Sequence, residues 1–412
     1  MSLRIGIIGM GGFAGTHHDF VNALEEEGRC RLVCTCDPER DAFADRARNL
    51  RFGERGVEFM DDYVAMLDAF RDRLDAVLIP TPIPLHAPMH RACVERGLPV
   101  YLEKPPTLSC QELEEMLTVE NRATRFTNVG FNYIAEPERQ ELKRRIVTGE
   151  FGTVRRVCLL GLTARPRSYY LRAPWAGRLM LNGQLVLDSC FGNAMAHLVH
   201  DILFWAGTGE VLSWADIENV DAELYRAHDI QGFDTVFATA RTKEGPEIRA
   251  ALSHACEQKP VHRETIVCDR ATIHYDVGAS YKVEHENGSV ESGEVRRVFL
   301  KENLSAYFDY LEGRAKRPLN RLADCRPFVA FNSLLYVAAG RINTIDNKHL
   351  AIAGSPGPDE YLEIAGLTEV SEEFLRSGAF PGKQRAPWAG SGGCAAASDV
   401  SHLPEAIRRI IG

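Results

Sequence analysis

The chain has 412 residues, of which 45% are hydrophobic and 25% are charged, and its formal net charge is -9 at pH 7. This length predicts two domains, each with its own core, and this composition excludes a disordered chain. The acidic balance, with no compensating basic block, argues against a nucleic-acid partner and favours a small molecule.

The start of the chain, its apolar runs and its cysteines are typical of a cytoplasmic protein. The start, MSLRIGIIGMGG, runs into glycines and lacks the apolar core and cleavage site of a signal peptide. No apolar run approaches the roughly 20 residues that span a bilayer. Eleven scattered cysteines suit buried, reduced thiols, and no Cys/His group has zinc spacing. We expect a cytoplasmic protein without a metal or a membrane partner.

The first part of the chain alternates short apolar runs with helical patterns. The strand candidates are 3–9, 31–36, 75–80 and 99–102, and the helix candidates are 16–26, 38–50, 86–96 and 111–121. This alternation predicts a parallel sheet that is covered by helices on both faces.

The pattern changes after about residue 128. Six β-rich runs follow, at 154–163, 233–242, 247–255, 264–275, 280–286 and 294–300. Helical patterns lie at 138–148, 194–205, 303–314 and 326–343. They predict an α/β domain with an open, largely antiparallel sheet. We therefore expect domains at 1–127 and 128–385, and a C-terminal segment, 386–412, that is irregular before a short final helix, 403–411.

The glycines that follow the first strand fit a dinucleotide-binding pattern. GIIGMGGFAG matches G-x-G-x-x-A at Gly9, Gly11 and Ala14, and Gly12 and Phe13 occupy the same turn. Gly9 permits the tight turn, Gly11 lets the backbone approach a pyrophosphate, and Ala14 allows close packing of the helix on the strand. The helix N-terminus then faces the phosphates. The alternative is a purely structural glycine turn.

An acid follows the second strand at the spacing that the pattern requires. Asp37 is placed to accept hydrogen bonds from the adenosine ribose hydroxyls, and its charge opposes a 2′-phosphate, so NAD is favoured over NADP. Arg40 lies nearby and leaves NADP possible, because it offers a positive charge to a phosphate. The alternative for Asp37 is an ordinary helix cap before Pro38.

The third and fourth strands end in further candidate residues. Thr81, Pro82 and His86 fall at the carboxyl edge of the sheet, where open α/β folds bind cofactors. His86 either faces the nicotinamide or only opens its helix. The run YLEKPPTLS places Lys104 at the next strand end, where an ammonium can stabilise a developing alkoxide. Glu103 either compensates this charge or orients the loop.

The chain resembles the Gfo/Idh/MocA family, named after glucose-fructose oxidoreductase, inositol dehydrogenase and MocA. The resemblance is carried by RIGIIGMGGFAGTHH, VCTCDPER, DAVLIPTPIPLHAPMHRACVERGLPVYLEKP and VGFNY, in the order and spacing of the family. It is specific over residues 3 to about 133 and weaker to about 345. It implies a Rossmann domain, a second domain whose open sheet makes oligomer contacts, a nicotinamide cofactor, and sugars or cyclitols as substrates.

The resemblance also implies site residues. Lys104 corresponds to the catalytic lysine of the family's E-K-P motif, and His197 to its helix histidine, as acid/base partner. Family members usually carry an aspartate four residues before that histidine, and here Asn193 stands there, sharing a helix face with His197. An asparagine can orient a hydroxyl but cannot carry a proton. Asp188 is a reserve candidate upstream, and His200 stands where the family often has an acid.

Other substrate candidates come from neighbouring segments. Tyr133 corresponds to a family segment near the substrate, and the alternative is a structural role. Tyr169, Arg172 and Trp175 precede the histidine helix, and aromatic rings with a cation suit a sugar.

The sequence therefore predicts an NAD(P)-dependent oxidoreductase that acts on a carbinol of a sugar, sugar acid or cyclitol and forms a homo-oligomer, a dimer or tetramer. Two alternatives remain open. One is a redox-neutral, NAD-dependent glycosidase of the same family type, and the other is a non-enzymatic NAD(P)-binding regulator.

Overall fold

The computed structural model describes residues 2–412 and divides them into two compact units. The first unit comprises residues 2–107, 111–135 and 298–325, and the second comprises 108–110, 136–297 and 326–412. The sequence-based boundary at 127 therefore differs from the structure, because residues 298–325 return to the first unit. Residues 386–412, expected as a separate segment, lie in the second unit.

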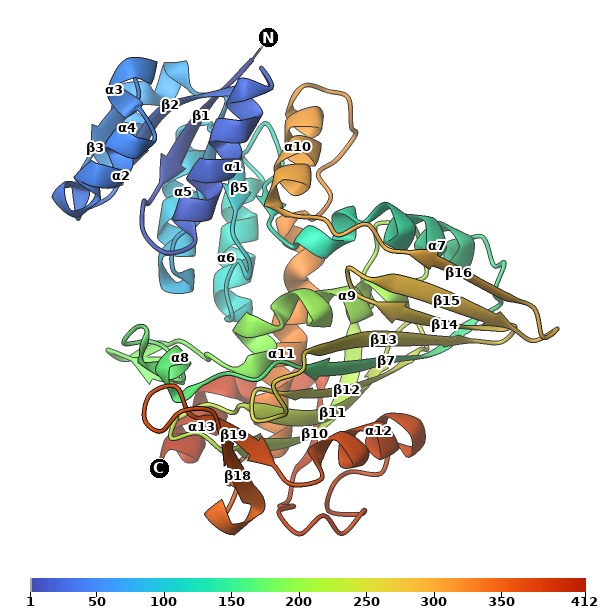
Figure 1. Ribbon diagram of the computed structural model, residues 1–412. Coiled ribbons are helices and arrows are strands. Elements are labelled where there is room, and N and C mark those ends of the chain that lie inside the picture. The colour runs from blue at the N-terminus through green and yellow to red at the C-terminus, as the bar shows by residue number, and fades with distance from the viewer. Residues whose placement is uncertain (1) are drawn as a thin grey trace. The chain divides into compact units, whose positions relative to one another are not determined.

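The first unit is built on a six-stranded parallel sheet in the order β3-β2-β1-β4-β5-β6 (Figure 1). The strands are β1 (Leu3–Ile8), β2 (Cys30–Cys36), β3 (Glu58–Met60), β4 (Ala76–Ile79), β5 (Val100–Leu102) and β6 (Asn128–Val129). This is the doubly wound order, in which the succession of strands across the sheet reverses between β1 and β4. Ligands are expected at the carboxyl ends of these two strands. The predicted parallel sheet is confirmed.

Helices and short helical turns complete the first unit. They are α1 (Ala14–Glu26), η1 (Arg40–Phe43), α2 (Ala44–Asn49), α3 (Phe52–Arg55), α4 (Tyr63–Phe70), η2 (Arg71–Arg73), η3 (Ile83–Leu85), α5 (His86–Glu95), α6 (Cys110–Glu120), η4 (Asn132–Ala135), α10 (Leu300–Leu311) and η6 (Leu322–Cys325). The helix expected over 38–50 is thus a 3₁₀ turn followed by a short helix. Strand β3 and helix α4 were not predicted.

Helix α10 completes the core of the first unit. Its apolar face, with Leu304 and Phe308 fully buried, packs against a cluster that includes Ile5 of β1 and Val21 of α1. The amide of Asn303 on the same helix accepts a hydrogen bond from the Tyr101 hydroxyl at 3.0 Å. This packing explains why a segment from late in the chain belongs to the first unit.

The second unit contains a ten-stranded sheet. Its order is β16-β15-β14-β13-β7-β12-β11-β10-β17, and β20 also pairs with β10. The strands are β7 (Val154–Leu162), β10 (Ile217–Arg226), β11 (Thr235–Thr242), β12 (Glu247–Ser253), β13 (Val261–Cys268), β14 (Ala271–Asp276), β15 (Ser280–His285), β16 (Val290–Glu294), β17 (Asn343–Thr344) and β20 (Gly393–Ala396). Most pairs are antiparallel, as predicted, but β7 runs parallel to β12 and β10 runs parallel to β17.

The remaining elements of the second unit surround this sheet. The helical elements are α7 (Pro137–Val147), α8 (Arg167–Leu171), η5 (Cys190–Ala194), α9 (Ala196–Ala206), α11 (Arg326–Ala339), η7 (Asn347–His349), α12 (Leu367–Ser377), η8 (Ala397–His402) and α13 (Leu403–Ile411). Two small hairpins are formed by β8 (Met180–Leu181) with β9 (Gln184–Leu185) and by β18 (Leu350–Ala353) with β19 (Tyr361–Ile364). Helices α9 and α11 cover one face of the large sheet, and α12 lies on the other (Figure 1).

Several strand predictions for this unit need correction. The run 264–275 is a hairpin of β13 and β14 instead of one strand, because Asp269 and Arg270 form its turn. The run 294–300 holds only the end of β16 and the first residue of α10. Strand β10 and helix α12 were missed, and the segment expected to be irregular contains β20.

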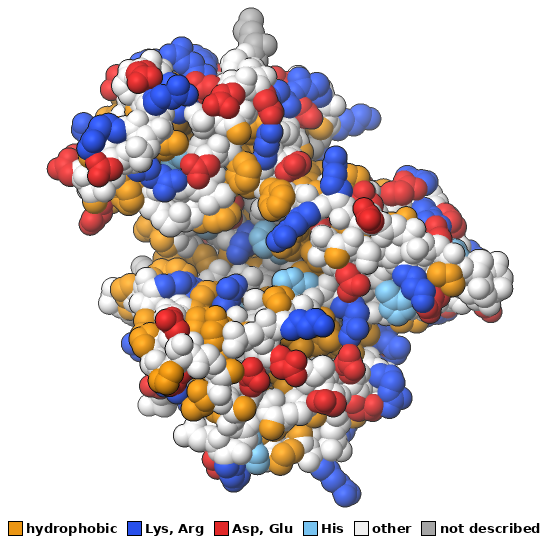
Figure 2. All heavy atoms as spheres, in the orientation of Figure 1, with side chains coloured by type: hydrophobic (Ala, Val, Ile, Leu, Met, Phe, Trp, Pro, Cys, Tyr) orange, Lys and Arg blue, Asp and Glu red, His pale blue; other side chains and the backbone are white. Residues whose placement is uncertain are grey.

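The surface carries both signs of charge. Acidic and basic side chains alternate over the visible face, without an extended area of one sign (Figure 2). Among residues 2–412, no helix has the length and hydropathy of a membrane span.

Candidate active site

The glycine turn after β1 has the geometry that a dinucleotide needs. Gly9 and Gly12 have φ angles of 110° and 55°, a region that favours glycine. The Gly9 N–H donates to the Cys36 carbonyl at 2.7 Å, and the Gly9 carbonyl accepts from His18 Nε2 at 3.1 Å. Because the His18 ring is buried, its pKa falls to about 4, so it stays a neutral donor that holds the turn.

The turn also presents free backbone donors. Within residues 2–412, the N–H groups of Gly11, Gly12 and Phe13 have no hydrogen-bond acceptor, and they lead directly into Ala14, the first residue of α1. A Cβ added at Gly12 would meet no atom within 4 Å. Unsatisfied N–H groups at the positive end of a helix are suited to a pyrophosphate. The predicted cofactor residues in this turn therefore fit a dinucleotide.

Asp37 follows β2 at the same edge of the sheet. Its Oδ2 accepts from the Met10 N–H at 2.9 Å, and its Oδ1 accepts from the Glu39 N–H at 3.0 Å. A carboxylate has about four acceptor sites, so two remain for ribose hydroxyls. Asp37 thus also anchors the glycine turn. Arg40 is exposed, with its guanidinium 5.8 Å from the Phe59 ring.

The residues after β4 divide into two groups. Thr81 is half-buried and Pro82 exposed at the strand end, in keeping with a place beside a cofactor. His86 is only 1% exposed, and its ring nitrogens lie 2.9 Å from the Pro105 carbonyl and 2.7 Å from the Thr81 carbonyl. Burial lowers its pKa. His86 therefore opens α5 and joins two loops, which supports the positioning alternative over direct cofactor contact.

The E-K-P loop is fixed from inside the first unit. Glu103 is 5% exposed, and its Oε2 accepts from the Lys104 N–H at 3.0 Å. Its Oε1 accepts from Nε2 of His17, a buried residue of α1, at 2.9 Å. Glu103 therefore orients the loop instead of contacting the cofactor. Sequence reasoning missed His17, although it lies in the quoted motif, three residues after Ala14.

In the second unit, the candidate helix begins with a π-helical turn, η5. Asn193 lies in this turn, whereas His197 lies in the first turn of α9, so the two do not share one regular α-helical face as predicted. Directly before the turn, Leu187 has a φ of 54°, a conformation that is costly for a branched residue. Such turns and strained residues are common at functional sites.

Asp188 contacts two of the other substrate candidates. Its Oδ1 accepts from Asn193 Nδ2 at 2.7 Å, its Oδ2 accepts from the Gly177 N–H at 2.6 Å, and Arg172 Nη2 lies 3.9 Å from Oδ2. The Arg172 guanidinium lies 3.7 Å from the Tyr169 ring centroid and 4.7 Å from that of Trp175. The structure thus brings together Tyr169, Arg172, Trp175, Asp188 and Asn193.

The two histidines of α9 differ. His197 is half-buried, whereas His200 is fully buried and its Nδ1 accepts from Trp214 Nε1 at 3.1 Å. Burial lowers the pKa of His200 well below its ordinary value, so the ring is neutral. His200 is a core residue, and its prediction as a substrate contact is corrected. Tyr133, in η4 of the first unit, is half-buried.

Buried polar groups hold α9 in place. The Lys143 ammonium donates to the carbonyls of Phe204 and Gly207 at the end of α9, and burial lowers its pKa to about 7. Near the middle of the helix, Asp201 Oδ2 lies 3.4 Å from Nη2 of the fully buried Arg139. Helix α7 therefore fixes the helix that carries His197.

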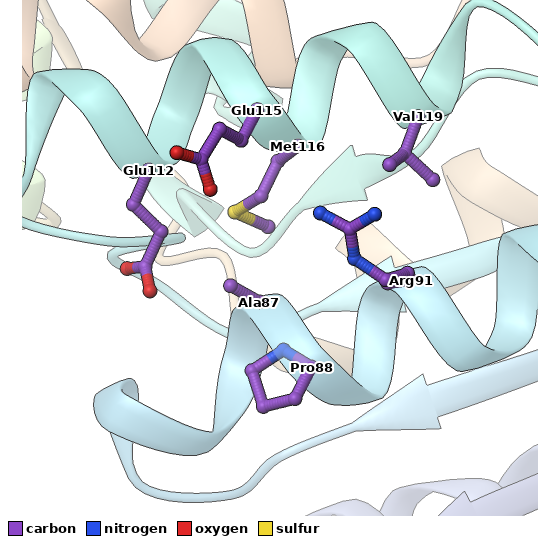
Figure 3. Close-up of a pocket in the computed structure, with 7 residues that line it drawn as sticks. All are labelled: Ala87, Pro88, Arg91, Glu112, Glu115, Met116 and Val119. Atoms are coloured by element: carbon purple, nitrogen blue, oxygen red, sulfur yellow. The ribbon is translucent and has the colours of Figure 1, made fainter.

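A pocket lies between α5 and α6 of the first unit (Figure 3). Its lining residues are Ala87, Pro88, Arg91, Glu112, Glu115, Met116 and Val119. None of them is a predicted site residue.

The first unit is similar to known NAD-binding oxidoreductases. Residues 3–131 match the family model described as "Oxidoreductase family, NAD-binding Rossmann fold" of GFO_IDH_MocA, which confirms the predicted resemblance and NAD as the cofactor. An inositol 2-dehydrogenase of Corynebacterium glutamicum strain R is 28% identical over 215 residues, 52% of this chain and 56% of that protein. Inositol 2-dehydrogenase 4 of Saccharopolyspora erythraea is 31% identical, over 36% of this chain and 42% of that protein. The matched regions thus span about half of these curated relatives.

Solved structures support the fold of both units. The WlbA dehydrogenase from Bordetella pertussis, solved with NADH and UDP-GlcNAcA, aligns with a TM-score of 0.65 at 20% identity, over 82% of this chain and 96% of that one. An NAD-binding oxidoreductase from Klebsiella pneumoniae aligns with a TM-score of 0.68 at 18% identity, over 81% and 96%. At these identities the likeness concerns the fold alone.

Proposed function

We propose that the chain is an NAD-dependent dehydrogenase of the Gfo/Idh/MocA oxidoreductase family, whose NAD-binding model matches residues 3–131. Its substrate is a sugar, sugar acid or cyclitol, and the reaction transfers hydride between C4 of the nicotinamide and a carbinol carbon. The curated relatives named inositol 2-dehydrogenases favour cyclitols as the first compounds to test.

The anchoring of Lys104 is the observation that carries this proposal. Its backbone N–H is held by Glu103, which is itself held by His17 on the helix that follows the glycine turn. The loop that carries a candidate catalytic ammonium is therefore tied to the element that would bind the pyrophosphate. Fixed placement of a charged group is what lowers the barrier in such sites.

The cofactor would be held by residues of the first unit. The N–H groups of Gly11, Gly12 and Phe13 would bind the pyrophosphate, and Asp37 would bind the adenosine ribose. When bound, NAD supplies the hydride acceptor. Asp37 would disfavour a 2′-phosphate because both are negatively charged.

The protein's own groups manage the hydroxyl proton. In oxidation, Lys104 stabilises the developing alkoxide and His197 takes the proton, and in reduction these roles reverse. A histidine suits this task because its ordinary pKa of about 6.5 lies near neutrality. Asn193, whose amide nitrogen donates to Asp188, orients the substrate. Asp188 is a positioning residue in this scheme, since both of its oxygens already accept hydrogen bonds from the protein.

The test is NADH formation from NAD over a panel of cyclitols, aldoses, sugar acids and aryl glycosides. Lys104→Ala is expected to lower kcat by about 10²-fold or more. Lys301→Ala, which removes a surface lysine of α10 in the same unit, is the matched control and is expected to keep wild-type activity.

The outcomes separate the alternatives. Release of an aglycone without NADH would replace the dehydrogenase with a redox-neutral glycosidase. Binding of NAD without turnover of any compound would favour a regulator. Equal loss of activity in Lys104→Ala and Lys301→Ala would remove Lys104 from the chemistry.

A further inference from the structure

Two arginines share one aromatic ring in the second unit. The guanidinium carbon of Arg172 lies 3.7 Å from the Tyr169 ring centroid, and that of Arg165 lies 4.7 Å from the same centroid. Tyr169 is in α8, Arg165 precedes this helix, and Arg172 ends it. Both arginines are therefore held near one ring by a single short segment.

The charge of these arginines is poorly compensated. Among the described residues, Arg165 has no carboxylate within 4.0 Å, and its buried Nε has no hydrogen-bond partner. The carboxylate near Arg172 is that of Asp188, at 3.9 Å, and it already accepts two shorter hydrogen bonds. By contrast, Arg167 on the same helix pairs with Glu360 at 3.1 Å. The segment thus holds excess positive charge in an acidic protein.

A buried histidine lies beside the same ring. The His254 ring centroid is 5.6 Å from that of Tyr169, and His254 is 1% exposed. Its Nδ1 is 2.8 Å from the Tyr170 hydroxyl, while its Nε2 is buried without a partner. Burial and the charge of Arg165 lower the pKa of His254 to about 3, so the ring is neutral. In the tautomer in which the Tyr170 hydroxyl donates to Nδ1, the proton is on Nε2, which is then a donor without an acceptor.

The backbone brings these groups to one edge of the sheet. Strands β7 and β12 are parallel and end at Leu162 and Ser253, which face each other. Just beyond these ends, the Arg165 N–H donates to the His254 carbonyl at 3.0 Å. Arg165 and His254 therefore lie just beyond two strand ends that the sheet holds together.

We propose that this arginine cluster, Arg165, Tyr169, Arg172 and His254, is a subsite for an anionic group of the substrate, a carboxylate or a phosphate. A guanidinium fork binds either anion with two parallel hydrogen bonds, and an imidazole N–H adds a third donor. The neighbouring Trp175 offers a surface for a sugar ring. The inference rests on the proposed function and narrows its substrate to acidic sugars or cyclitols.

The test is calorimetric titration of the full-length, NAD-saturated protein with glucuronate, glucose 6-phosphate, glucose and inorganic phosphate. At least one charged sugar is expected to bind about ten-fold more tightly than glucose, or about 1.4 kcal/mol. Arg165→Gln and Arg172→Gln are each expected to remove that advantage, so that the charged sugar binds no more tightly than glucose binds to the same variant. Arg167→Gln, which removes the paired arginine of the same helix, is expected to retain it.

A second measurement needs no variant. Raising the ionic strength from about 0.05 M to about 0.5 M is expected to weaken binding of the charged sugar but not of glucose, because salt screens exposed charges. The better of glucuronate and glucose 6-phosphate identifies the anion.

The inference is overturned if charged sugars bind no better than glucose, if none of the probes binds, if Arg167→Gln has the same effect, or if inorganic phosphate alone binds as tightly as the charged sugars. These results are independent of NADH formation, so failure of the subsite and failure of the dehydrogenase proposal are distinguishable.

Discussion

Asp201 shares a buried guanidinium with two other carboxylates. Arg139 bonds to Glu136 Oε2 at 3.0 Å and to Glu264 Oε2 at 2.7 Å, and all four side chains are at most 1% exposed. Asp201 has the weakest contact of the three, because its Oδ2 lies 3.4 Å from Arg139 Nη2, farther than the oxygens of Glu136 and Glu264 lie from the guanidinium. Burial, together with the charges of Glu264 and Glu136, raises the pKa of Asp201 well above its ordinary value. We therefore expect Asp201 to be protonated in the folded protein.

Asp201→Asn tests this protonation, because it keeps the shape and removes the titration. The unfolded chain releases the Asp201 proton near pH 4, while the folded chain keeps it until its raised pKa is reached. This group therefore stabilises the fold fully at low pH, and the contribution falls by about 1.4 kcal/mol per pH unit as the pH rises. Above about pH 5, the free energy of unfolding of the variant relative to wild type is therefore expected to rise with pH, by about 1.4 kcal/mol per pH unit while Asp201 stays protonated in the folded protein.

The assay is urea unfolding followed by tryptophan fluorescence. All four tryptophans, at 175, 205, 214 and 388, lie in the second unit, so the signal reports on the unit that contains Asp201. Comparing variant with wild type at each pH cancels the other titrating groups. Asp276→Asn, at the exposed end of β14, controls for the change in net charge. A difference between Asp201→Asn and wild type that does not vary with pH would show that Asp201 is ionised in the fold, and would refute the reasoning.

Two further changes test the site, and a third tests a buried lysine. His17→Leu breaks the hydrogen bond to Glu103 and is expected to lower kcat by roughly 10²-fold with little change in NAD affinity, while His17→Gln is expected to recover part of kcat. The control is His90→Gln, at another buried histidine of the first unit. An equal loss of kcat in this control would indicate a general packing effect. Asp37→Ala is expected to weaken NAD binding by about ten-fold and to reduce the preference in affinity for NAD over NADP. An unchanged ratio of the two affinities would show that Asp37 does not bind the adenosine ribose. Because burial lowers the pKa of Lys143 to about 7, the unfolded chain holds an extra proton above that pH. Between about pH 7 and about pH 10, the free energy of unfolding of wild type should therefore rise by about 1.4 kcal/mol per pH unit relative to that of Lys143→Met. Urea midpoints that change with pH in the same way in both proteins would contradict this.

The sequence by itself determined the elements whose signals are local. The glycine turn, Asp37 and the E-K-P lysine each lie within a few residues of a strand end, and parallel strands bring their carboxyl ends to one edge. The spacing along the chain therefore placed these residues at the edge where we propose that the cofactor binds. The change to β-rich runs after residue 128 likewise predicted the second sheet, since antiparallel strands need only short turns.

Only the tertiary structure decided what depends on contacts between distant segments. The return of α10 to the first core, and the bond from His17 to Glu103, join residues that no local pattern relates. Burial assigned His86 and His200 to the interior, although their residue type suited a site. The arginine cluster arose because β7 and β12 end side by side, far apart in the chain. Such outcomes follow from packing and desolvation, which are properties of the assembled core and are absent from any short stretch of sequence.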